Sequence, residues 1–345
     1  KLSKWQNPLL ELYEKNDKFI VPSSRRNEVV NFVKSGLKDL SVSRTSFSWG
    51  IKVPDNKNHV IYVWLDALTN YLSAVKYPHI EDDLYKKYWP ASLHVIGKDI
   101  LRFHAVYWPA FLLAAGIKPP MRILSHGWIL SDEEKMSKSK GNILNPIDLI
   151  KKYGIDQIRY YLMKEVSLGN DGSISLKNLE KCINSDLANN FGNLCQRVFS
   201  FVKNNCSNKI PVNGDMKKED LDLREGITSN LETLKELMND QKLNEYLKKV
   251  IEITFNTNKY INDMEPWKLK NKDIKRMNTI LNVALGQICK ISILLNPIIP
   301  ISTNKVLDAI NVPKKSRNFL RLKDDNLFNP DSKLGNIDIL FKKFI

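Results

Sequence analysis

Hydrophobic positions in the first half of the chain switch repeatedly between helical and strand-like spacing. Their recurrence every three or four residues over 25–40 predicts a helix, with Ser23 and Ser24 as candidate caps at its start. The short apolar runs 59–64 and 93–96 predict buried strands, because they are brief and rich in β-branched and aromatic residues. A fold that mixes helices and strands is therefore expected here.

The pattern over 99–130 predicts that the second of these strands belongs to a larger unit. Residues 99–115 have helical spacing despite Pro109, and 122–124 together with 128–130 predicts the next strand. Strand, helix and strand within about 40 residues form a βαβ unit, whose strands are parallel and joined by a right-handed crossover. The first half should therefore contain a parallel sheet.

Helical spacing alone characterises the chain from about residue 176 onward. Apolar residues recur at intervals of three and four in 227–238, 243–251 and 280–295. Amphipathic helices of this kind bury one face against each other, so the second half is expected to be an all-α bundle. The lysine-rich stretch 212–222 predicts a solvated loop, and no internal repeat is visible. The fold class is thus α/β followed by all-α.

The amino-acid composition and net charge favour one class of binding partner but do not identify it. The 345 residues are 43% hydrophobic, enough to bury a core, and the length suggests about two domains. Lys and Arg number 53 against 38 Asp and Glu, which gives a net charge of +15. Such a surplus favours a polyanionic partner such as nucleic acid or anionic lipid. A biased genome, rich in Lys, Asn and Ile, accounts for the charge equally well.

Cysteine and histidine spacing argues against a metal-built or disulfide-built protein. The four cysteines form no C-x-x-C pair and the five histidines no H-x-x-x-H, so neither a structural zinc site nor a disulfide framework is expected. Reduced thiols are typical of a cytoplasmic protein. The apolar stretch 291–301 is interrupted by polar residues and prolines, and no signal peptide opens the chain, so no membrane partner is expected. The opening on Lys1, without Met, indicates a cut end.

The clearest chemistry lies in a Lys/Ser-rich loop, 131–142, after the strand that is predicted to end near Leu130. A loop at the carboxyl edge of a parallel strand lies where open α/β sheets bind ligands. Lysines separated by serines can neutralise and hydrogen-bond the oxygens of a phosphate group. The loop therefore suits phosphoryl transfer, in which positioning and charge neutralisation dominate. A solvated surface loop is the alternative.

The string Lys135-Met-Ser-Lys-Ser139 is the KMSKS signature of class I aminoacyl-tRNA synthetases. Its surroundings resemble one branch of that class, the methionyl-tRNA synthetase family, in a single register. The matching segments are 64–71, 96–109, 126–128, 186–193 and 265–267. The resemblance covers nearly the whole chain. It implies the second half of a class I Rossmann-like nucleotide-binding fold, followed by an anticodon-binding helical bundle.

The resemblance also implies a division of labour along the chain. Residues 1–120 would hold the second half of the catalytic domain with the end of its connective insertion, 121–175 the KMSKS loop and stem-contact connector, and 176–345 the anticodon-binding bundle. The implied activity is that of a methionine–tRNA ligase, which uses ATP and Mg²⁺ to form methionyl-adenylate and then charges tRNA(Met). The oligomeric state is left open.

Site residues follow from the resemblance position by position. The predicted methionine pocket is lined by Trp64, Ala67, Leu68, Tyr71, Ile100, Phe103, His104 and Trp108. The predicted ATP site contains Lys98, His126, Gly127, Trp128, Ile129, Lys135, Met136, Ser137, Lys138 and Ser139. Lys135 and Lys138 are the expected catalytic residues, because they would stabilise charge on the departing pyrophosphate. Polarizable rings around a thioether make physical sense, although core packing explains the same residues.

Two smaller sets complete the predicted site. The resemblance pairs Arg44 with Asp99 beside the active site, as a supporting ion pair. It places Trp267 against the anticodon, where a presented aromatic ring holds an unstacked base. Arg197 and Asn189 are the expected companions of Trp267. Three other asparagines of the same segment compete with Asn189 for this role: Asn184, Asn190 and Asn193. No residue is predicted to ligate a metal.

One expected element does not occur in the sequence. Class I synthetases carry a second signature, H-x-G-H, and its nearest counterpart here is His94-Val-Ile-Gly-Lys98. The chain is therefore expected to be the C-terminal portion of a longer protein. Two rival functions follow: a tRNA-binding module without adenylation activity, or a related class I synthetase for leucine, isoleucine, valine or cysteine. The pocket segments argue against the second.

Overall fold

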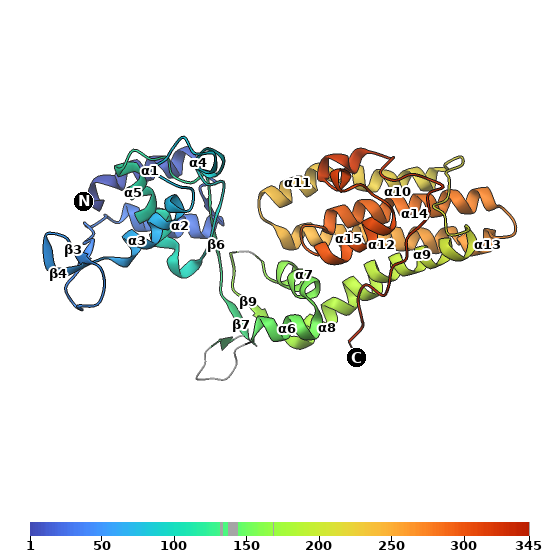
Figure 1. Ribbon diagram of the computed structural model, residues 1–345, viewed down its shortest axis with the longest axis horizontal. Helices are drawn as coiled ribbons and strands as arrows, with labels where there is room; N and C mark the ends of the chain where they lie inside the picture. The colour runs from blue at the N-terminus through green and yellow to red at the C-terminus, as the bar shows by residue number, and fades with distance from the viewer. Residues whose placement is uncertain (132–133, 137–143, 168, 345) are drawn as a thin grey trace. The chain divides into compact units, whose positions relative to one another are not determined.

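A computed structural model describes residues 1–131, 134–136, 144–167 and 169–344 of the chain (Figure 1). Backbone contacts divide it into two compact units: Lys1–Trp128 with Leu168–Asp171, and Ile129–Ser167 with Gly172–Ile345. The first is the α/β unit and the second is dominated by helices. The predicted three-part division, with boundaries at 120 and 175, stays a prediction beside these two units.

The α/β unit is built on a three-stranded parallel sheet with strand order β1-β6-β5. These strands are Ile20–Val21, Ile123–His126 and His94–Gly97, respectively. β5 and β6 pair in parallel from His94 opposite Ile123 to Gly97 opposite His126, and the helical segment between them crosses over. The predicted βαβ unit is therefore confirmed. Strand β1 is too short to have been visible as a pattern.

Helices in this unit pack their apolar stripes around the sheet. They are η1 (Leu2–Trp5), α1 (Gln6–Lys15), α2 (Ser23–Lys34), α3 (Val63–Ser73), α4 (Asp83–Tyr88), η2 (Lys98–Ile100), η3 (Phe103–Tyr107) and α5 (Trp108–Ala114). The predicted helix over 25–40 ends early, because Gly36 adopts a φ of 102°. Ser23 and Ser24 are its first residues, not its caps, and Pro22 holds the N-cap position.

The strand predicted over 59–64 is wrong at its end and in its environment. Strand β4 spans Asn56–Ile61 and pairs antiparallel with β2 (Ser43–Arg44) and β3 (Lys52–Val53). Only Val60 of β4 is buried, so the strand belongs to a surface sheet. Helix α3 begins at Val63, and Trp64 is therefore helical. The same apolar residues fit the start of an amphipathic helix, which periodicity over six residues cannot exclude.

The crossover helix contains an irregular turn around Pro109. Residues Phe103–Tyr107 form a π-helical turn, η3, which leads directly into α5. Pro109 has no N–H to donate to the carbonyl of Ala105, four residues earlier. The hydroxyl of Tyr13, on α1, donates to that carbonyl instead, over 2.6 Å in the buried interior. The helix predicted over 99–115 is thus confirmed, with its missing hydrogen bond supplied by another helix.

Residues 122–130 form two strands where one was expected. β6 ends at His126, and β7 (Ile129–Ser131) belongs to a separate sheet with order β8-β7-β9 in the second unit. β8 (Glu134–Lys135) pairs antiparallel with β7, and β9 (Gly172–Ile174) pairs in parallel with it. The prediction of a single strand was wrong because Gly127 and Trp128 interrupt the pairing.

The second unit confirms the predicted helical bundle (Figure 1). Its helical segments are α6 (Pro146–Tyr153), α7 (Ile155–Glu165), α8 (Leu176–Cys182), η5 (Ile183–Gly192), α9 (Asn193–Asn205), α10 (Lys218–Thr228), α11 (Leu231–Asn239), α12 (Leu243–Met264), α13 (Pro266–Leu269), α14 (Ile274–Leu295), α15 (Pro300–Ala309), η6 (Lys314–Ser316) and η7 (Phe319–Lys323). The loop predicted over 212–222 ends earlier than expected, since α10 begins at Lys218.

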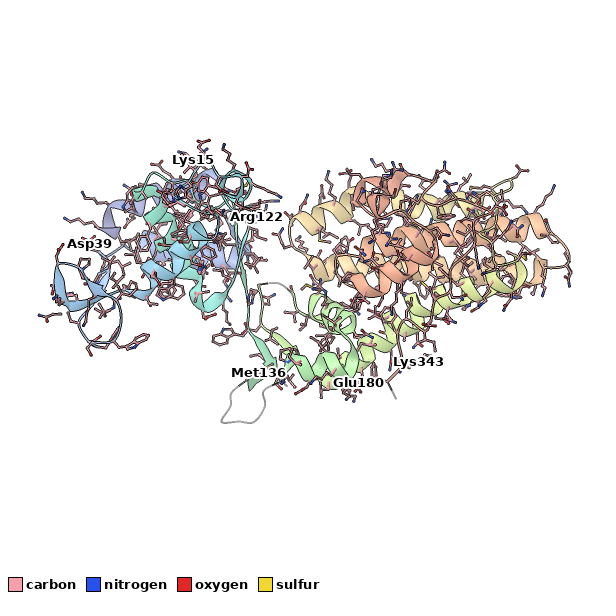
Figure 2. The ribbon with its side chains drawn as sticks, viewed as in Figure 1. Lys15, Asp39, Arg122, Met136, Glu180 and Lys343 are labelled. Atoms are coloured by element: carbon pink, nitrogen blue, oxygen red, sulfur yellow. The ribbon has the colours of Figure 1, made fainter. Side chains whose placement is uncertain are left out.

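Side chains hold α6 and α8 together near the start of this unit. Glu180 lies on α8 (Figure 2). The hydroxyl of Tyr153 donates to its carboxylate over 2.6 Å, and Lys152 contacts the same carboxylate. Asn145 caps α6 by accepting from the N–H of Ile147, next to a proline at the first helical position. These local contacts fix the helices that follow the β7–β8 hairpin.

Helix α14 is the central element of the bundle. Among the described helices it alone is long and apolar enough to cross a membrane, but 89% of its most apolar window is buried inside the protein. It packs alongside α12, which carries its own apolar stripe from Tyr246 to Ile261. An apolar helix surrounded by other helices is the ordinary core of a bundle.

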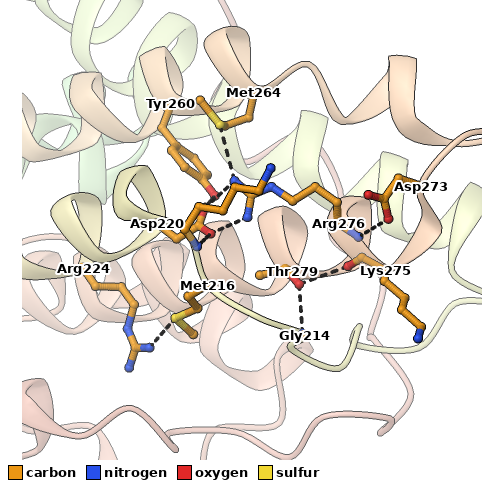
Figure 3. A network of polar contacts seen from close by, with 11 residues as sticks. Gly214, Met216, Asp220, Arg224, Tyr260, Met264, Asp273, Lys275, Arg276 and Thr279 are labelled. Atoms are coloured by element: carbon orange, nitrogen blue, oxygen red, sulfur yellow. Dashed lines mark hydrogen bonds and ion pairs between the residues drawn. The ribbon is translucent and has the colours of Figure 1, made fainter.

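One buried ion pair ties three helices of the bundle together (Figure 3). The Asp220 side chain, on α10, is fully buried, and its carboxylate accepts hydrogen bonds from both terminal nitrogens of Arg276 on α14 and from the hydroxyl of Tyr260 on α12. Burial acts to raise the pKa of Asp220, but the hydrogen bonds from Arg276, Tyr260 and the Lys217 N–H outweigh it and hold the pKa below its usual value.

Arg276→Ala is therefore expected to lower the free energy of unfolding by about 3–5 kcal/mol, because it leaves a buried carboxylate without its counter-ion. Chemical denaturation at neutral pH measures this. The matched control is Arg321→Ala, whose pair with Asp324 is partly exposed on both sides and should contribute less than about 1 kcal/mol. Equal losses from the two substitutions would contradict the assignment.

Candidate functional site

The residues predicted to line a methionine pocket gather in the α/β unit. Trp64 and Phe103 stack with ring centroids 3.9 Å apart, and the edge of His104 faces Trp64 at 6.1 Å. Tyr71 contacts both His104 and Trp108 through its ring. Leu68 packs into the same apolar cluster. Helix α3 and the segment η3–α5 supply these side chains. Five aromatic or imidazole rings therefore pack against one another between the two segments.

Ile100 and Ala67 lie less centrally than expected. Ile100 packs beside a different apolar cluster, formed by α1, α2 and the parallel sheet. Ala67 is exposed on α3. Ile100 still contributes to the pocket through its backbone, because its carbonyl is a hydrogen-bond partner of His104.

Two hydrogen bonds determine the protonation of His104. Its Nδ1 lies 3.0 Å from the Ile100 carbonyl, which can only accept, so Nδ1 carries the proton. Burial lowers the pKa of His104, and the neutral ring therefore has Nε2 free to accept. The hydroxyl of Tyr71, 2.9 Å away, donates to it. Burial also raises the pKa of Tyr71. The pair is thus uncharged and oriented near neutral pH.

His94, on β5, is a third titratable group that the sequence did not single out as part of this site. It is buried, with its ring centroid 4.2 Å from that of Tyr71, and its Nδ1 has no hydrogen-bond partner among the described residues. Burial, and then the nearby His104, lower the pKa of His94 to about 4. The aromatic cluster therefore contains two neutral imidazoles. An uncharged, polarizable lining of this kind suits a thioether.

Lys98, the first residue predicted for the ATP site, is held from two sides. Its Nζ lies 2.7 Å from the Asp171 carboxylate and 4.2 Å from the centroid of the Trp128 ring. Asp171 also accepts a hydrogen bond from the Trp128 backbone N–H, over 2.9 Å. Hydrogen bonds from Lys98 and from Trp128 lower the pKa of Asp171, so it is ionised. Sequence reasoning missed Asp171, because it lies 73 positions from Lys98.

Gly127 explains how Asp171 reaches this position. A Cβ at residue 127 would lie 2.2 Å from the backbone of Asn170 and 2.5 Å from the Asp171 nitrogen, so only glycine permits the two segments to cross. The neighbouring His126 has its Nδ1 2.8 Å from the Gly127 carbonyl and donates to it. Four predicted ATP-site residues, Lys98 and 126–128, therefore form one connected group in the α/β unit.

The remaining predicted ATP-site residues belong to the second unit. Ile129 begins β7 and is partly exposed, and Lys135 ends β8. Met136 follows β8 (Figure 2). Ser137, Lys138 and Ser139 lie outside the described residues, so their assignment, like that of Lys135, rests on the KMSKS string itself.

The predicted pairing of Arg44 with Asp99 is not among the ion pairs of the described residues. Arg44 instead donates to the backbone carbonyls of Ser41 and Ser43, and its guanidinium lies 3.9 Å from the centroid of the Tyr62 ring. Strand β2 holds it there. Asp99 is exposed on η2. The supporting role of the pair stays a prediction.

In the helical unit, the structure brings Trp267 and Arg197 together. Helix α12 ends at Met264, and its C-cap Glu265 has a left-handed backbone (φ 44°) that turns the chain before Pro266 starts α13. This turn presents Trp267, which is 43% exposed. The Arg197 guanidinium, on α9, lies 5.9 Å from the centroid of its ring, and both residues line a hollow of about 330 Å³.

Asn189 is better placed than two of its three competitors. Asn184 is bonded to the backbone of Phe344, and Asn190 is bonded to Asn258 on α12. Asn189 and Asn193 are exposed and line a second hollow, which Arg197 also lines. The choice between these two asparagines is not made by the geometry.

Family models match the chain over most of its length. The model for class I tRNA synthetases of the methionine type matches residues 1–199, and the model for the anticodon-binding domain of methionyl-tRNA ligase matches 210–344. The chain belongs to the methionyl-tRNA synthetase family. The first model spans the aromatic cluster and the KMSKS string, and the second spans Trp267.

Individual relatives agree with this family. The chain is 49% identical to the methionine–tRNA ligase of Rickettsia felis, over 99% of its own length and 67% of that protein. It is 47% identical to the Brucella suis enzyme, over 92% of the chain and 62% of the relative. The structure of the Mycobacterium tuberculosis methionyl-tRNA synthetase in complex with methionyl-adenylate matches with a TM-score of 0.93 at 41% identity, covering 99% of this chain and 67% of that one. The chain thus spans about two thirds of these family members.

The neutral histidines predict an acid-sensitive α/β unit. An unfolded histidine protonates near pH 6.5 and folded His94 only near pH 4. Between these values the unfolded state binds more protons, so stability is fully present above pH 6.5 and is lost as the pH falls toward 4. The loss from His94 should reach about 3 kcal/mol. Denaturation between pH 7 and 4.5 measures it; His94→Phe should flatten the profile, and the exposed control His79→Phe should not.

The close crossing predicts that Gly127→Ala destabilises the protein by about 2 kcal/mol or more, since the added methyl group meets backbone that cannot move aside cheaply. Thermal unfolding of the purified variant measures the loss. As a control, Gly226→Ala within α10 adds a methyl group to open space and should stabilise by up to about 1 kcal/mol. A Gly127→Ala protein as stable as wild type would refute the crossing.

Proposed function

We propose that this chain carries out the methionine–tRNA ligase reaction of its family. In that reaction the methionine carboxylate attacks the α-phosphate of ATP; the new bond is a carboxyl–phosphate anhydride, and pyrophosphate leaves. The methionyl group then passes to the 3′-terminal adenosine of tRNA(Met), and AMP leaves. The observation that carries the proposal is the uncharged cluster of Trp64, Phe103, Tyr71 and His104 in a chain matched throughout by methionyl-tRNA synthetase models.

Recognition of methionine would rest on this aromatic cluster. Sulfur favours contact with aromatic rings, and Trp64, Phe103 and Trp108 supply them. The Tyr71 hydroxyl and His104 are hydrogen-bonded to each other, so the pair needs no water molecule in the proposed pocket to satisfy that donor and acceptor. A hydrophobic pocket of this kind discriminates by shape and polarizability, which suits a flexible thioether better than a short branched side chain.

Handling of ATP would fall to Lys98, the backbone around Gly127 and the lysines of the KMSKS string. Lys98 is fixed by Asp171 and Trp128, which orients its ammonium group in advance. Lys135 and Lys138 would stabilise charge on the departing pyrophosphate, a task in which positioning and electrostatics dominate.

Mg²⁺ would accompany ATP in this reaction. Among the described residues, no three His, Cys, Asp or Glu side chains gather as a metal site. Mg²⁺ is commonly bound through substrate phosphates with only one or two carboxylates, so it would be held here mainly by ATP. When bound, the ion would share in neutralising the phosphate charge.

Binding of tRNA(Met) would use the hollow beside Trp267. An exposed indole ring next to a guanidinium can hold an unstacked base by stacking and hydrogen bonding. Arg197 is held by Asn262 over 2.8 Å, which leaves its other nitrogens for the RNA. Asn189 or Asn193 would read the base edge from the neighbouring hollow.

A cytoplasmic location also belongs to this proposal. All four cysteines are free thiols in the structure. Burial raises the pKa of each, so they are poor nucleophiles and are suited to a reducing compartment.

Methionine-dependent ATP–pyrophosphate exchange tests the adenylation half of the proposal. Exchange should require methionine and should not be supported by leucine, isoleucine, valine or cysteine. In the complete polypeptide, Lys138→Ala should slow exchange by about 100-fold or more while methionine binding barely changes. Trp267→Ala should spare exchange and weaken tRNA charging by about tenfold or more. An absence of exchange together with intact tRNA binding would favour the alternative, a tRNA-binding module.

A further inference from the structure

The second hollow of the helical unit contains an aromatic residue to which nothing so far gives a role. The hollow has a volume of about 660 Å³, and its lining includes Asn189, Asn193, Arg197, Lys248, Phe255 and Asn262. It adjoins the Trp267 hollow, because Arg197 lines both. Phe255 is 62% exposed.

Phe255 lies on the polar side of α12. The buried positions of this helix include Val250, Ile253, Thr257 and Ile261, and they face the bundle core. Phe255 falls outside that stripe, on the side of Lys248, Glu252, Asn258 and Asn262, which recur at helical intervals. The face of this ring is therefore accessible to a planar partner, and what distinguishes Phe255 from other exposed apolar residues is its place in a hollow lined by cations and amides.

The opposite wall of the hollow is fixed in place. The Asn258 side chain donates to the Asn190 side-chain oxygen over 2.8 Å, and the Asn190 amide reaches the Ile251 carbonyl over 3.4 Å. These bonds join α12 to the π-helical segment η5. The neighbouring Asn189 lines the same wall and is exposed.

The charged and polar side chains of the hollow favour a ligand that combines an anionic group with a planar, polar ring. Lys248 is exposed, and Arg197 is oriented by Asn262. The acidic residues of the lining are already engaged: Glu252 pairs with Lys249, and Asp186 is bound by Tyr160 and Lys164. An exposed ring, two cations and several side-chain amides are the groups with which proteins hold an unstacked nucleotide.

We propose that Phe255 is a second stacking platform for tRNA, which holds an unpaired base of the same loop that contacts Trp267, with Lys248 on the adjoining phosphate. The proposal rests on the function proposed above, since it takes the RNA to be the one that binds at Trp267. It adds a residue that the family resemblance did not suggest, and it gives the hollow a defined occupant.

An RNA hairpin carrying the anticodon loop of tRNA(Met), titrated against the full chain, tests this directly. Phe255→Leu, which keeps an apolar side chain but removes the π face, should weaken binding by about 5- to 100-fold, while Phe255→Tyr should stay within about twofold of wild type. Removing loop bases one at a time should reveal one abasic hairpin for which Phe255→Leu no longer matters. The proposal is overturned if Phe255→Leu and Phe255→Tyr bind the hairpin with equal affinity and no abasic hairpin distinguishes them.

Salt dependence provides a second readout with a matched control. Lys248→Ala should reduce the slope of log affinity against log salt concentration by about one, whereas Lys209→Ala, which is paired with Asp331 and lines neither hollow, should leave it unchanged. Equal slopes for both variants would remove Lys248 from the proposal. Trp267→Ala distinguishes failure of this inference from failure of the proposed function. If Trp267→Ala weakens binding of the hairpin and Phe255→Leu does not, only this inference fails. If the wild-type chain does not bind the hairpin, the proposed tRNA function fails as well.

Discussion

The absence of a single side-chain atom at Gly127 is the constraint on which the α/β unit depends. It lets the backbone of Asn170 and Asp171 lie where a Cβ would be, and the chain that has passed into the second unit thereby returns to the first. That return places one carboxylate against both the Lys98 ammonium and the Trp128 N–H. The end of β6, the orientation of Lys98 and the position of the indole ring therefore share one steric cause.

The two units bury different kinds of polar group: neutral histidines in the α/β unit and a charged pair in the bundle. Around Tyr71, burial keeps His94 and His104 neutral, so the aromatic cluster has oriented hydrogen bonds without net charge. In the bundle, the charged pair of Asp220 and Arg276 is buried and holds helices together, whereas the rings that could contact RNA are exposed. The net charge of +15 is consistent with the proposed RNA partner, and the exposed indole of Trp267 beside Arg197 is a more specific reason for that proposal.

Periodicity in the sequence was enough to predict the βαβ unit and the bundle, because both depend on long stripes of apolar residues. It was insufficient where a few residues fit two structures: Trp64 belongs to a helix and not to the end of a strand. Residues 122–130 divide into two strands that pair in different sheets, and Gly127 between them lies against the backbone of Asn170, a long-range approach that no local pattern contains. Family resemblance supplied the pocket residues and Trp267, whereas Asp171 and Phe255 required coordinates: one meets its partner across 73 positions, and the other is visible only through its exposure.

The bond between Tyr13 and the Ala105 carbonyl has a further consequence for how this pocket can change. Pro109 makes the crossover helix incomplete on its own, and a hydroxyl from α1 completes it, so two positions 96 residues apart are under one constraint. A residue with an N–H in place of Pro109 could bond the Ala105 carbonyl itself and relieve the Tyr13 hydroxyl of that role, although the Tyr13 ring would stay in the core. Loss of the hydroxyl alone would leave a buried carbonyl unsatisfied. The turn that carries Phe103 and His104 is thus held by a hydrogen bond from α1, a helix that supplies no residue to the predicted pocket.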